Sequence, residues 1–174
     1  MANLDDLDLK ILEIVQRNNQ VTSETISRRV GLSSSAVQRR LNRLRKNKTI
    51  ELEVSAVSPL AVGRNLSAVV SIKLDREAPQ LLKKFKELVL TMPEIMQCYY
   101  VTGDTDFVLL VTSRDMQDYN LFLQRLADQF PHIARLDTNV VLERIKIGLS
   151  LPLVDRAGDP LLAAGGRVSI RPKS

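Results

Sequence analysis

The sequence predicts an α+β fold: an N-terminal winged-type helix-turn-helix domain, with three helices plus a connecting strand, and a C-terminal ferredoxin-like βαββαβ domain. Two observations lead to this fold class. Apolar residues recur at helical spacing in three short segments before residue 50, and strand-like and helix-like segments then follow in the order βαββαβ. The predicted domains are residues 1–50, 51–65 (connecting strand and hinge), 66–148 and 149–174 (C-terminal extension). The chain has 174 residues, 44% of them hydrophobic, which is enough for two small cores.

The first helices are marked by periodicity and by capping residues. Residues 4–19 carry apolar side chains at helical spacing, and three Asp residues near their start favour the positive end of a helix dipole. Thr22 or Ser23 can cap a second helix over residues 23–30. Gly31 can end that helix because glycine readily adopts a positive φ.

The third helix carries an unusual charge pattern. Ser33 can cap it, and Val37, Leu41 and Leu44 lie at i, i+4 and i+7 on its apolar face. Two helices joined by a glycine-containing turn are typical of a helix-turn-helix. Residues 25–50 contain eight Lys or Arg residues and no Asp or Glu. A solvated helix face is the alternative interpretation, but such a face usually mixes both signs, so we predict DNA binding.

The side chains predicted to contact DNA lie opposite the apolar face of this third helix. At about 100° per residue, that face carries hydroxyl, amide and guanidinium groups, which can hydrogen-bond to base edges in the major groove. The residues predicted to contact bases are Ser34, Ser35, Gln38, Arg39, Asn42 and Arg43. The residues predicted to contact phosphates are Thr22, Ser23, Arg40, Arg45, Lys46 and Lys48.

After residue 50 the apolar pattern changes from helical spacing to alternation. Residues 50–56 alternate apolar and polar side chains, which predicts the connecting strand, and Pro59 and Gly63 mark the hinge. Strands are predicted at residues 66–74, 95–102, 106–112 and 133–147, and helices at 79–92 and 115–130. This order is that of a ferredoxin-like domain, with two helices on one face of a four-stranded antiparallel sheet.

The sheet face without helices is predicted to be apolar as well. Neighbouring residues such as Val69 and Val70, or Val108 and Leu109, place apolar side chains on both faces of their strands. A second copy of the same sheet is the simplest cover for this face. We therefore expect a homodimer, whose two-fold symmetry matches a palindromic operator in double-stranded DNA.

Composition argues against several other classes of protein. No apolar run is as long as a membrane span and no signal-peptide pattern is present, so a cytoplasmic location without membrane contact is expected. The single Cys98 and the single His132 cannot form an internal disulfide or a Cys/His metal site, and we expect neither a metal nor a cofactor. No catalytic Ser/His/Asp or Cys/His set is present, which predicts a non-enzyme. A ferredoxin-like metabolic enzyme or enzyme regulatory subunit is the less favoured alternative.

The two regions together resemble the Lrp/AsnC, or feast/famine, family of bacterial and archaeal transcription regulators. The resemblance covers about residues 4–146, and within the βαββαβ part it includes "VTGDTDFVLLV" and "TNVVLERIK". It implies a C-terminal domain that dimerises and often assembles into discs of four dimers, with an amino acid bound between dimers. The chain departs from the family pattern at Lys48, where many members have Gly, and at residues 149–174, which extend beyond the matched region.

The same resemblance implies an effector site on the Gly-Asp-x-Asp hairpin and the last strand. By position it falls on Tyr100, Thr102, Gly103, Asp104, Thr105, Asp106, Phe107, Asp137, Thr138 and Val140. Gly103 would permit close backbone approach, and Asp104 or Asp106 could accept a hydrogen bond from an ammonium group. An ordinary hairpin turn is the alternative, because Gly and Asp are common turn residues.

These observations predict a sequence-specific, DNA-binding transcriptional regulator. We expect a homodimer that assembles into a tetramer or octamer and responds to an amino acid or a related small metabolite. An architectural DNA-binding protein that senses no effector is the main alternative, and an effector response distinguishes the two.

Overall fold

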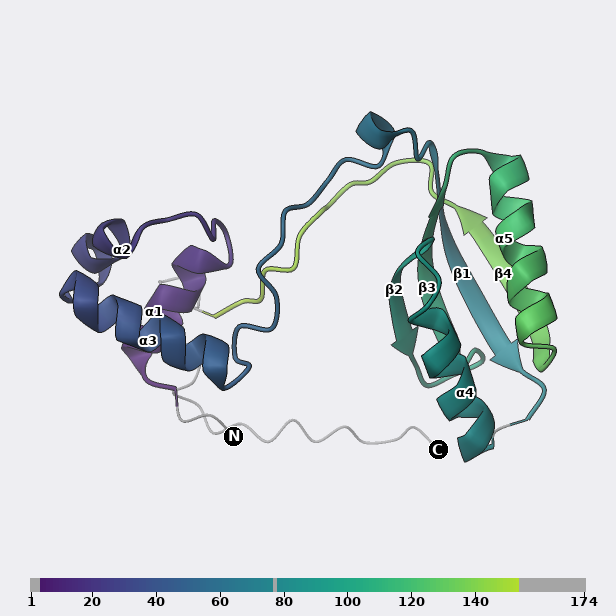
Figure 1. The fold of residues 1–174 in the computed structure, drawn as a ribbon, viewed down its shortest axis with the longest axis horizontal. Coiled ribbons are helices and arrows are strands. Elements are labelled where there is room, and N and C mark those ends of the chain that lie inside the picture. Colours follow the sequence, from purple (N-terminus) through teal and green to yellow (C-terminus); the bar gives the residue numbers. More distant parts are fainter. Residues whose placement is uncertain (1–3, 77, 154–174) are drawn as a thin grey trace. The chain divides into compact units, whose positions relative to one another are not determined.

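The computed structural model describes residues 4–76 and 78–153, which form two compact units (Figure 1). Described residues up to Ser55 and from Ile147 onward make up the first unit, and Ala56–Lys146 make up the second. The chain therefore leaves the first unit once and returns to it. No helix among the described residues is long and apolar enough to cross a membrane.

The returning segment is attached to the first helix of the chain. The side-chain amide of Gln16 accepts a hydrogen bond from Leu151 N–H and donates one to Leu151 C=O, both 2.9 Å long. Residues 154–174, which are most of the predicted C-terminal extension, lie outside the described residues.

Three helices form the first unit: α1 (Asp6–Val15), α2 (Ser23–Val30) and α3 (Ser34–Lys46). Ile11, Ile26 and Val37, one from each helix, have no exposed surface and meet in one apolar cluster. A helix-turn-helix is stabilised in this way, because each short helix buries only one stripe and needs the other two to cover it.

The predicted helix ends are confirmed at both sides of the turn. Thr22 Oγ1 accepts a hydrogen bond from Thr25 N–H (3.2 Å) at the start of α2, and Ser33 Oγ accepts one from Ala36 N–H (3.2 Å) at the start of α3. Gly31 ends α2 with φ of 71°, a left-handed conformation that costs a glycine little.

The second unit has the predicted βαββαβ order: β1 (Leu66–Leu74), α4 (Pro79–Val89), β2 (Ile95–Tyr100), β3 (Phe107–Ser113), α5 (Met116–Gln129) and β4 (Ile133–Val140). All strand pairs are antiparallel, in the order β2-β3-β1-β4. Figure 1 shows α4 and α5 on the same face of this sheet. A short 3₁₀ helix, η1 (Leu60–Val62), precedes β1.

Strand alternation decides which face of the sheet is covered. Val70 and Ile72 of β1 have no exposed surface and pack with Phe85 of α4 and Phe122 of α5. The intervening residues, such as Val69, project from the opposite face and are only partly buried in the single chain. This uncovered face is the one predicted to bind a second subunit.

Two predicted strands differ in the structure. Residues 51–58 have no regular secondary structure and pair with no strand in the described part of the chain, so the connecting strand is not formed. The last strand ends at Val140 rather than at residue 147. Val140 pairs with Ala68, two residues after the start of β1, and one further backbone hydrogen bond follows, from Val141 N–H to Ser67 C=O (2.8 Å).

Candidate DNA-binding surface and effector site

The outer face of α3 carries the side chains predicted to contact bases. Val37, Leu41 and Leu44 face the core and are at most 4% exposed, so the opposite face points to solvent. All six residues predicted to contact bases are exposed. The first turn of α3 has no acidic residue, and its last turn has three basic ones. The face therefore offers hydrogen-bond donors and positive charge without a carboxylate of its own.

Two amides and one hydroxyl form a hydrogen-bonded chain at this face. Ser23 Oγ of α2 donates to Gln38 Oε1 (2.7 Å), and Gln38 Nε2 donates to Asn42 Oδ1 (3.1 Å). Both carbonyl oxygens therefore have a partner, and amide N–H groups are left to donate outward. Such donors fit phosphate oxygens and the acceptor atoms of base edges. The chain also orders these side chains before DNA is present, which reduces the entropy lost on binding.

The residues predicted to contact phosphates are used in different ways. Thr22 is the cap of α2, and Ser23 is bonded to Gln38. Arg45 donates from Nε (2.9 Å) and Nη2 (2.8 Å) to the carboxylate of Glu53, and this hydrogen bond holds the pKa of Glu53 below its ordinary value. Lys46 and Lys48 are exposed, and Arg40 belongs to the network described next.

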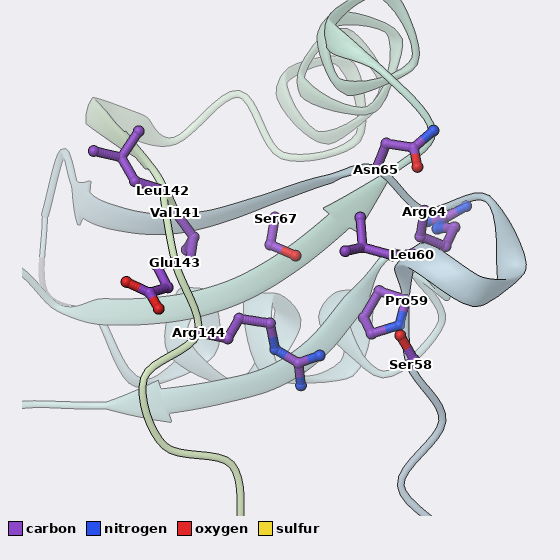
Figure 2. A pocket seen from close by; sticks show the side chains of 10 residues that line it. All are labelled: Ser58, Pro59, Leu60, Arg64, Asn65, Ser67, Val141, Leu142, Glu143 and Arg144. Carbon is purple, nitrogen blue, oxygen red and sulfur yellow. The ribbon is translucent and has the colours of Figure 1, made fainter.

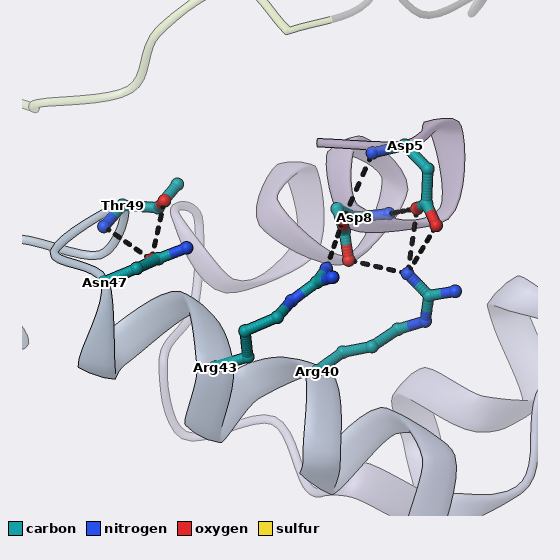
Figure 3. A network of polar contacts seen from close by, with 6 residues as sticks. All are labelled: Asp5, Asp8, Arg40, Arg43, Asn47 and Thr49. Carbon is teal, nitrogen blue, oxygen red and sulfur yellow. Dashed lines mark hydrogen bonds and ion pairs between the residues drawn. The ribbon is translucent and has the colours of Figure 1, made fainter. Parts of the chain in front are cut away.

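A cluster of charges joins the start of α1 to α3 (Figure 3). Asp5 and Asp8 form a capping box, in which Asp8 N–H donates to Asp5 Oδ1 (2.8 Å) and Asp5 N–H to Asp8 Oδ2 (3.1 Å). Arg40 Nη1 donates to both oxygens of Asp5 (2.8 and 2.7 Å) and to Asp8 Oδ1 (2.7 Å). Arg43 Nη2 donates to Asp8 Oδ2. Asp8 has no exposed surface, so this buried carboxylate is held by two arginines.

The pKa values follow from these contacts. Burial pushes the pKa of Asp5 upward, but the hydrogen bonds from Arg40 and from the Asp8 amide, with the positive charges of Arg40 and Arg43, outweigh it and leave the pKa below its ordinary value. Hydrogen bonds to Asp5 and Asp8 raise the pKa of Arg40. Both groups therefore stay charged at neutral pH.

The turn after α3 places Lys48 in a backbone conformation that favours glycine. Lys48 has φ of 62°, the only positive φ at a residue other than glycine in the described part of the chain. A glycine fits this conformation without strain, whereas a lysine side chain does not. Asn47 Oδ1 stabilises the turn by accepting from Thr49 N–H (3.1 Å) and Thr49 Oγ1 (2.8 Å) (Figure 3).

In the second unit, the predicted effector residues of the hairpin lie at one end of the sheet. Asp106 is only 4% exposed, and its Oδ2 accepts from Leu74 N–H (2.7 Å) while Lys73 Nζ lies 3.4 Å from its Oδ1. Both oxygens are therefore used where the register between β1 and β4 shifts. Gly103 has φ of 120°, and Asp104 beside it is exposed. Of the two carboxylates, Asp104 is the one free to meet a ligand.

The remaining hairpin residues divide between the core and the surface. Thr105 Oγ1 donates to Ile72 C=O (2.7 Å), and Phe107 has no exposed surface. Tyr100 is 51% exposed. The centroid of its ring lies 5.1 Å from the centroid of the Phe107 ring and 4.9 Å from the Nζ of Lys86. Thr102 is exposed. Tyr100 and Thr102 are therefore the side chains of this end that a ligand can reach.

The predicted effector residues of β4 project from opposite faces of the sheet. Thr138 Oγ1 lies 2.7 Å from the hydroxyl of Tyr119 on α5, so Thr138 faces the helices. Asp137 accepts from Arg135 Nε (2.7 Å) on the uncovered face. Val140 is half-exposed at the end of the strand. A single chain thus does not bring the ten predicted residues onto one surface.

A shallow hollow lies elsewhere in the second unit (Figure 2). It has a volume of about 270 Å³ and is lined by residues 58–60, 64, 65, 67 and 141–144. Arg64 stands at its edge and donates from Nη2 to Thr112 C=O, which attaches the segment before β1 to the end of β3. None of the ten predicted effector residues lines this hollow.

Comparison with known proteins assigns both units. Residues 4–45 match the AsnC-type helix-turn-helix domain, and residues 67–151 match the Lrp/AsnC ligand binding domain. The chain belongs to the Lrp/AsnC family. An HTH-type transcriptional regulator of Sinorhizobium fredii is 43% identical over 150 residues, which are 86% of this Lrp/AsnC chain and 89% of the relative. The leucine-responsive regulatory protein of Haemophilus influenzae is 32% identical over 143 residues, 82% of this chain and 86% of the relative.

Solved structures of similar sequence have the same fold. An AsnC family transcriptional regulator from Agrobacterium tumefaciens matches with a TM-score of 0.80 at 30% identity, covering 86% of this chain and 97% of that one. A transcriptional regulator from Neisseria meningitidis in complex with L-Met matches with a TM-score of 0.79 at 31% identity, covering 87% and 97%. This Lrp/AsnC protein is a helix-turn-helix transcriptional regulator with a family ligand-binding domain.

Sequence reasoning missed three roles in this Lrp/AsnC regulator. Asp8 was expected only to favour a helix dipole, yet it holds two arginines of α3. Asp106 was expected as a ligand contact, and the structure shows it bonded to β1. Tyr119 lies in the predicted helix 115–130 without an assigned role, and its hydroxyl is 2.7 Å from Thr138 Oγ1. One signal was available: Asp5 and Asp8, like Arg40 and Arg43, are three apart and therefore share a helix face.

Proposed function

We propose that this Lrp/AsnC regulator binds a palindromic operator in double-stranded DNA as a homodimer, and that an amino acid or related metabolite changes this binding. The observation that carries the proposal is the exposed, acid-free outer face of α3, with Ser34, Ser35, Gln38, Arg39 and Asn42 as its base contacts. We propose a cytoplasmic location and no catalytic role, in keeping with the relatives named as transcriptional regulators.

Replacement of Arg39 tests the DNA-binding surface. Arg39→Ala should reduce operator affinity by about 1–3 kcal/mol if the guanidinium contacts a base. Lys83→Ala is the matched control, because Lys83 is an exposed cation on α4 of the other unit and its loss should leave affinity unchanged. Unchanged operator affinity in Arg39→Ala would contradict the assignment of α3.

The uncovered sheet face supports the dimer. Val69 of β1 lies opposite Leu110 of β3, and Val108 of β3 lies opposite Tyr99 of β2, so these four side chains form a continuous apolar patch. Tyr99 is 54% exposed in the single chain. Such a patch favours binding to the same patch on a second subunit, which gives a two-fold symmetric dimer. We propose that these dimers assemble further into a tetramer or octamer.

A charge on this patch tests the dimer. Leu110→Asp should give a monomer by light scattering, because a carboxylate cannot be buried against a copy of itself without a partner. Leu90→Asp is the control, since Leu90 is 87% exposed just after α4. A dimer in Leu110→Asp would exclude this interface.

The effector proposal rests on the family domain and on two relatives. One is named leucine-responsive, and the other was solved with L-Met. Tyr100, Thr102, Gly103 and Asp104 are the accessible part of the predicted site, and a second subunit would be needed to complete it. Asp104→Ala should therefore abolish the amino-acid response while DNA binding without effector persists. A normal response in this variant would place the site elsewhere.

A further inference from the structure

Apart from Arg45, which is paired with Glu53, the basic residues of α3 fall into two structural groups. Arg39 and Lys46 are exposed and form no ion pair within the described residues. Arg40 and Arg43 instead turn back toward α1, where both donate to Asp8 (Figure 3). Their side chains are 24% and 49% exposed. Only the first group is free to approach DNA as the structure stands.

Asp8 makes this arrangement difficult to break. Its carboxylate has no exposed surface while both arginines are in place, so its hydrogen bonds come from protein groups rather than from water. Removal of one partner from a buried ion pair leaves an uncompensated charge, which is strongly unfavourable. Arg40 is held further by Asp5, with bonds of 2.8 and 2.7 Å to its two oxygens. The two arginines are therefore part of the packing between α1 and α3.

We propose that Asp8 is a positioning residue that holds Arg40 and Arg43 on α1 and keeps their charges away from the DNA backbone. This inference rests on the proposed binding of DNA by α3, and it departs from the sequence-based prediction that Arg40 contacts phosphate and Arg43 contacts bases. DNA contact then goes through Arg39, Lys46 and the amide side chains of the outer face.

The arrangement has a consequence for specificity. Arginine contacts to phosphates raise affinity for every sequence, and each adds to the dependence of binding on salt. A buried carboxylate that retains two arginines lowers this general affinity without altering the side chains that face the bases. The charges of Arg40 and Arg43 therefore stabilise the packing of α3 on α1 and add less to the affinity for random DNA than free arginines would.

The test compares two full-length variants that each remove one negative charge from α1. Asp8→Asn weakens the hold on both arginines, whereas Asp6→Asn is the matched control, because Asp6 is exposed in the same turn and forms no ion pair within the described residues. Binding to a random-sequence duplex is measured by fluorescence anisotropy across a salt series, with folding checked by circular dichroism.

Asp8→Asn should steepen the slope of log K against log salt by about one to two per subunit, since each phosphate contact contributes about 0.9. Asp6→Asn should leave the slope as in the wild type. A simple loss of packing would reduce the amount of active protein without steepening the slope. Equal slopes in the two variants would overturn the proposal.

A second pair of variants decides the question if Asp8→Asn does not fold. Arg39→Gln should lower the salt slope by about one per subunit, and Arg43→Gln should leave it unchanged, because of these two arginines only Arg39 is free to approach DNA. An equal decrease in both variants would refute the proposed role of Asp8. Absence of salt-dependent DNA binding in the wild type would instead refute the proposed function itself.

Discussion

Asp106 and Asp104 should behave differently when each is replaced by Ala, although both belong to the Gly-Asp-x-Asp hairpin. Asp106→Ala removes the acceptor of the buried Leu74 N–H and the partner of Lys73. A buried donor left without a partner costs about 1–3 kcal/mol, and the half-exposed Lys73 contact adds at most about 1 kcal/mol. We therefore expect the free energy of unfolding of this unit to fall by about 2–3 kcal/mol.

The predicted loss corresponds to a decrease in Tm of about 8–24 °C, because 1 kcal/mol shifts Tm by about 4–8 °C in a domain of this size. Asp106→Asn keeps one acceptor oxygen and should lose less. Asp104→Ala should stay within about 0.5 kcal/mol of the wild type, because Asp104 is exposed.

Tyrosine fluorescence in a urea titration is the appropriate assay. The chain has no Trp, and all three tyrosines, at positions 99, 100 and 119, lie in the second unit, so the signal reports that unit alone. The urea midpoint of Asp106→Ala could equal that of the wild type, or Asp104→Ala could lose as much stability as Asp106→Ala. Either result would refute the assignment of Asp106 as the partner of Leu74 N–H and Lys73 that stabilises this end of the sheet.

Two other predictions concern a turn and a titration. Lys48→Gly should raise the free energy of unfolding of the first unit by about 0.5–1 kcal/mol, because glycine accepts the φ of 62° without strain. Lys46→Gly, in the last turn of α3, should lower this free energy. Denaturant unfolding followed by far-UV circular dichroism measures both changes. Hydrogen bonds from the Arg114 side chain and backbone lower the pKa of Asp118 to about 2, so the NMR titration midpoint should lie there and rise toward 3.8 in Arg114→Gln. Because this pKa is lowered on folding, the contact stabilises the fold above about pH 4 and is lost as the pH falls to 2. A titration midpoint of Asp118 near 3.8 in the wild type would contradict its contact with Arg114. A free energy of unfolding for Lys48→Gly no higher than that of the wild type would contradict the strain at Lys48.

Most helices and strands could be predicted because their apolar periodicity is local. The cap at Ser33, the glycine at Gly31 and the βαββαβ order all follow from residues close together in the chain. Strand ends are different, because a strand continues only as far as its partner. The last strand stops at Val140, which pairs with Ala68 near the start of β1, although the alternating sequence continues to residue 147.

In the candidate site too, local features could be predicted from the sequence and long-range contacts could not. The exposed face of α3 follows from its helical repeat, so Gln38, Arg39 and Asn42 could be placed on it from the sequence. The partners of charged side chains could not be placed, because Asp8 and Arg40 are 32 residues apart and meet only when α1 packs on α3. The sequence therefore made all cations of residues 25–50 equal candidates for DNA contact. The structure distinguishes those that pair with acidic residues from those that are free.

The most direct test of the regulator is binding of the full chain to a labelled duplex from its own upstream region, by anisotropy, across a salt series and with each of the twenty amino acids. We predict binding that weakens steeply with salt and shifts with one or a few amino acids. Salt-dependent binding that no amino acid shifts would favour an architectural protein. Failure to bind either this duplex or random DNA at low salt would contradict the account.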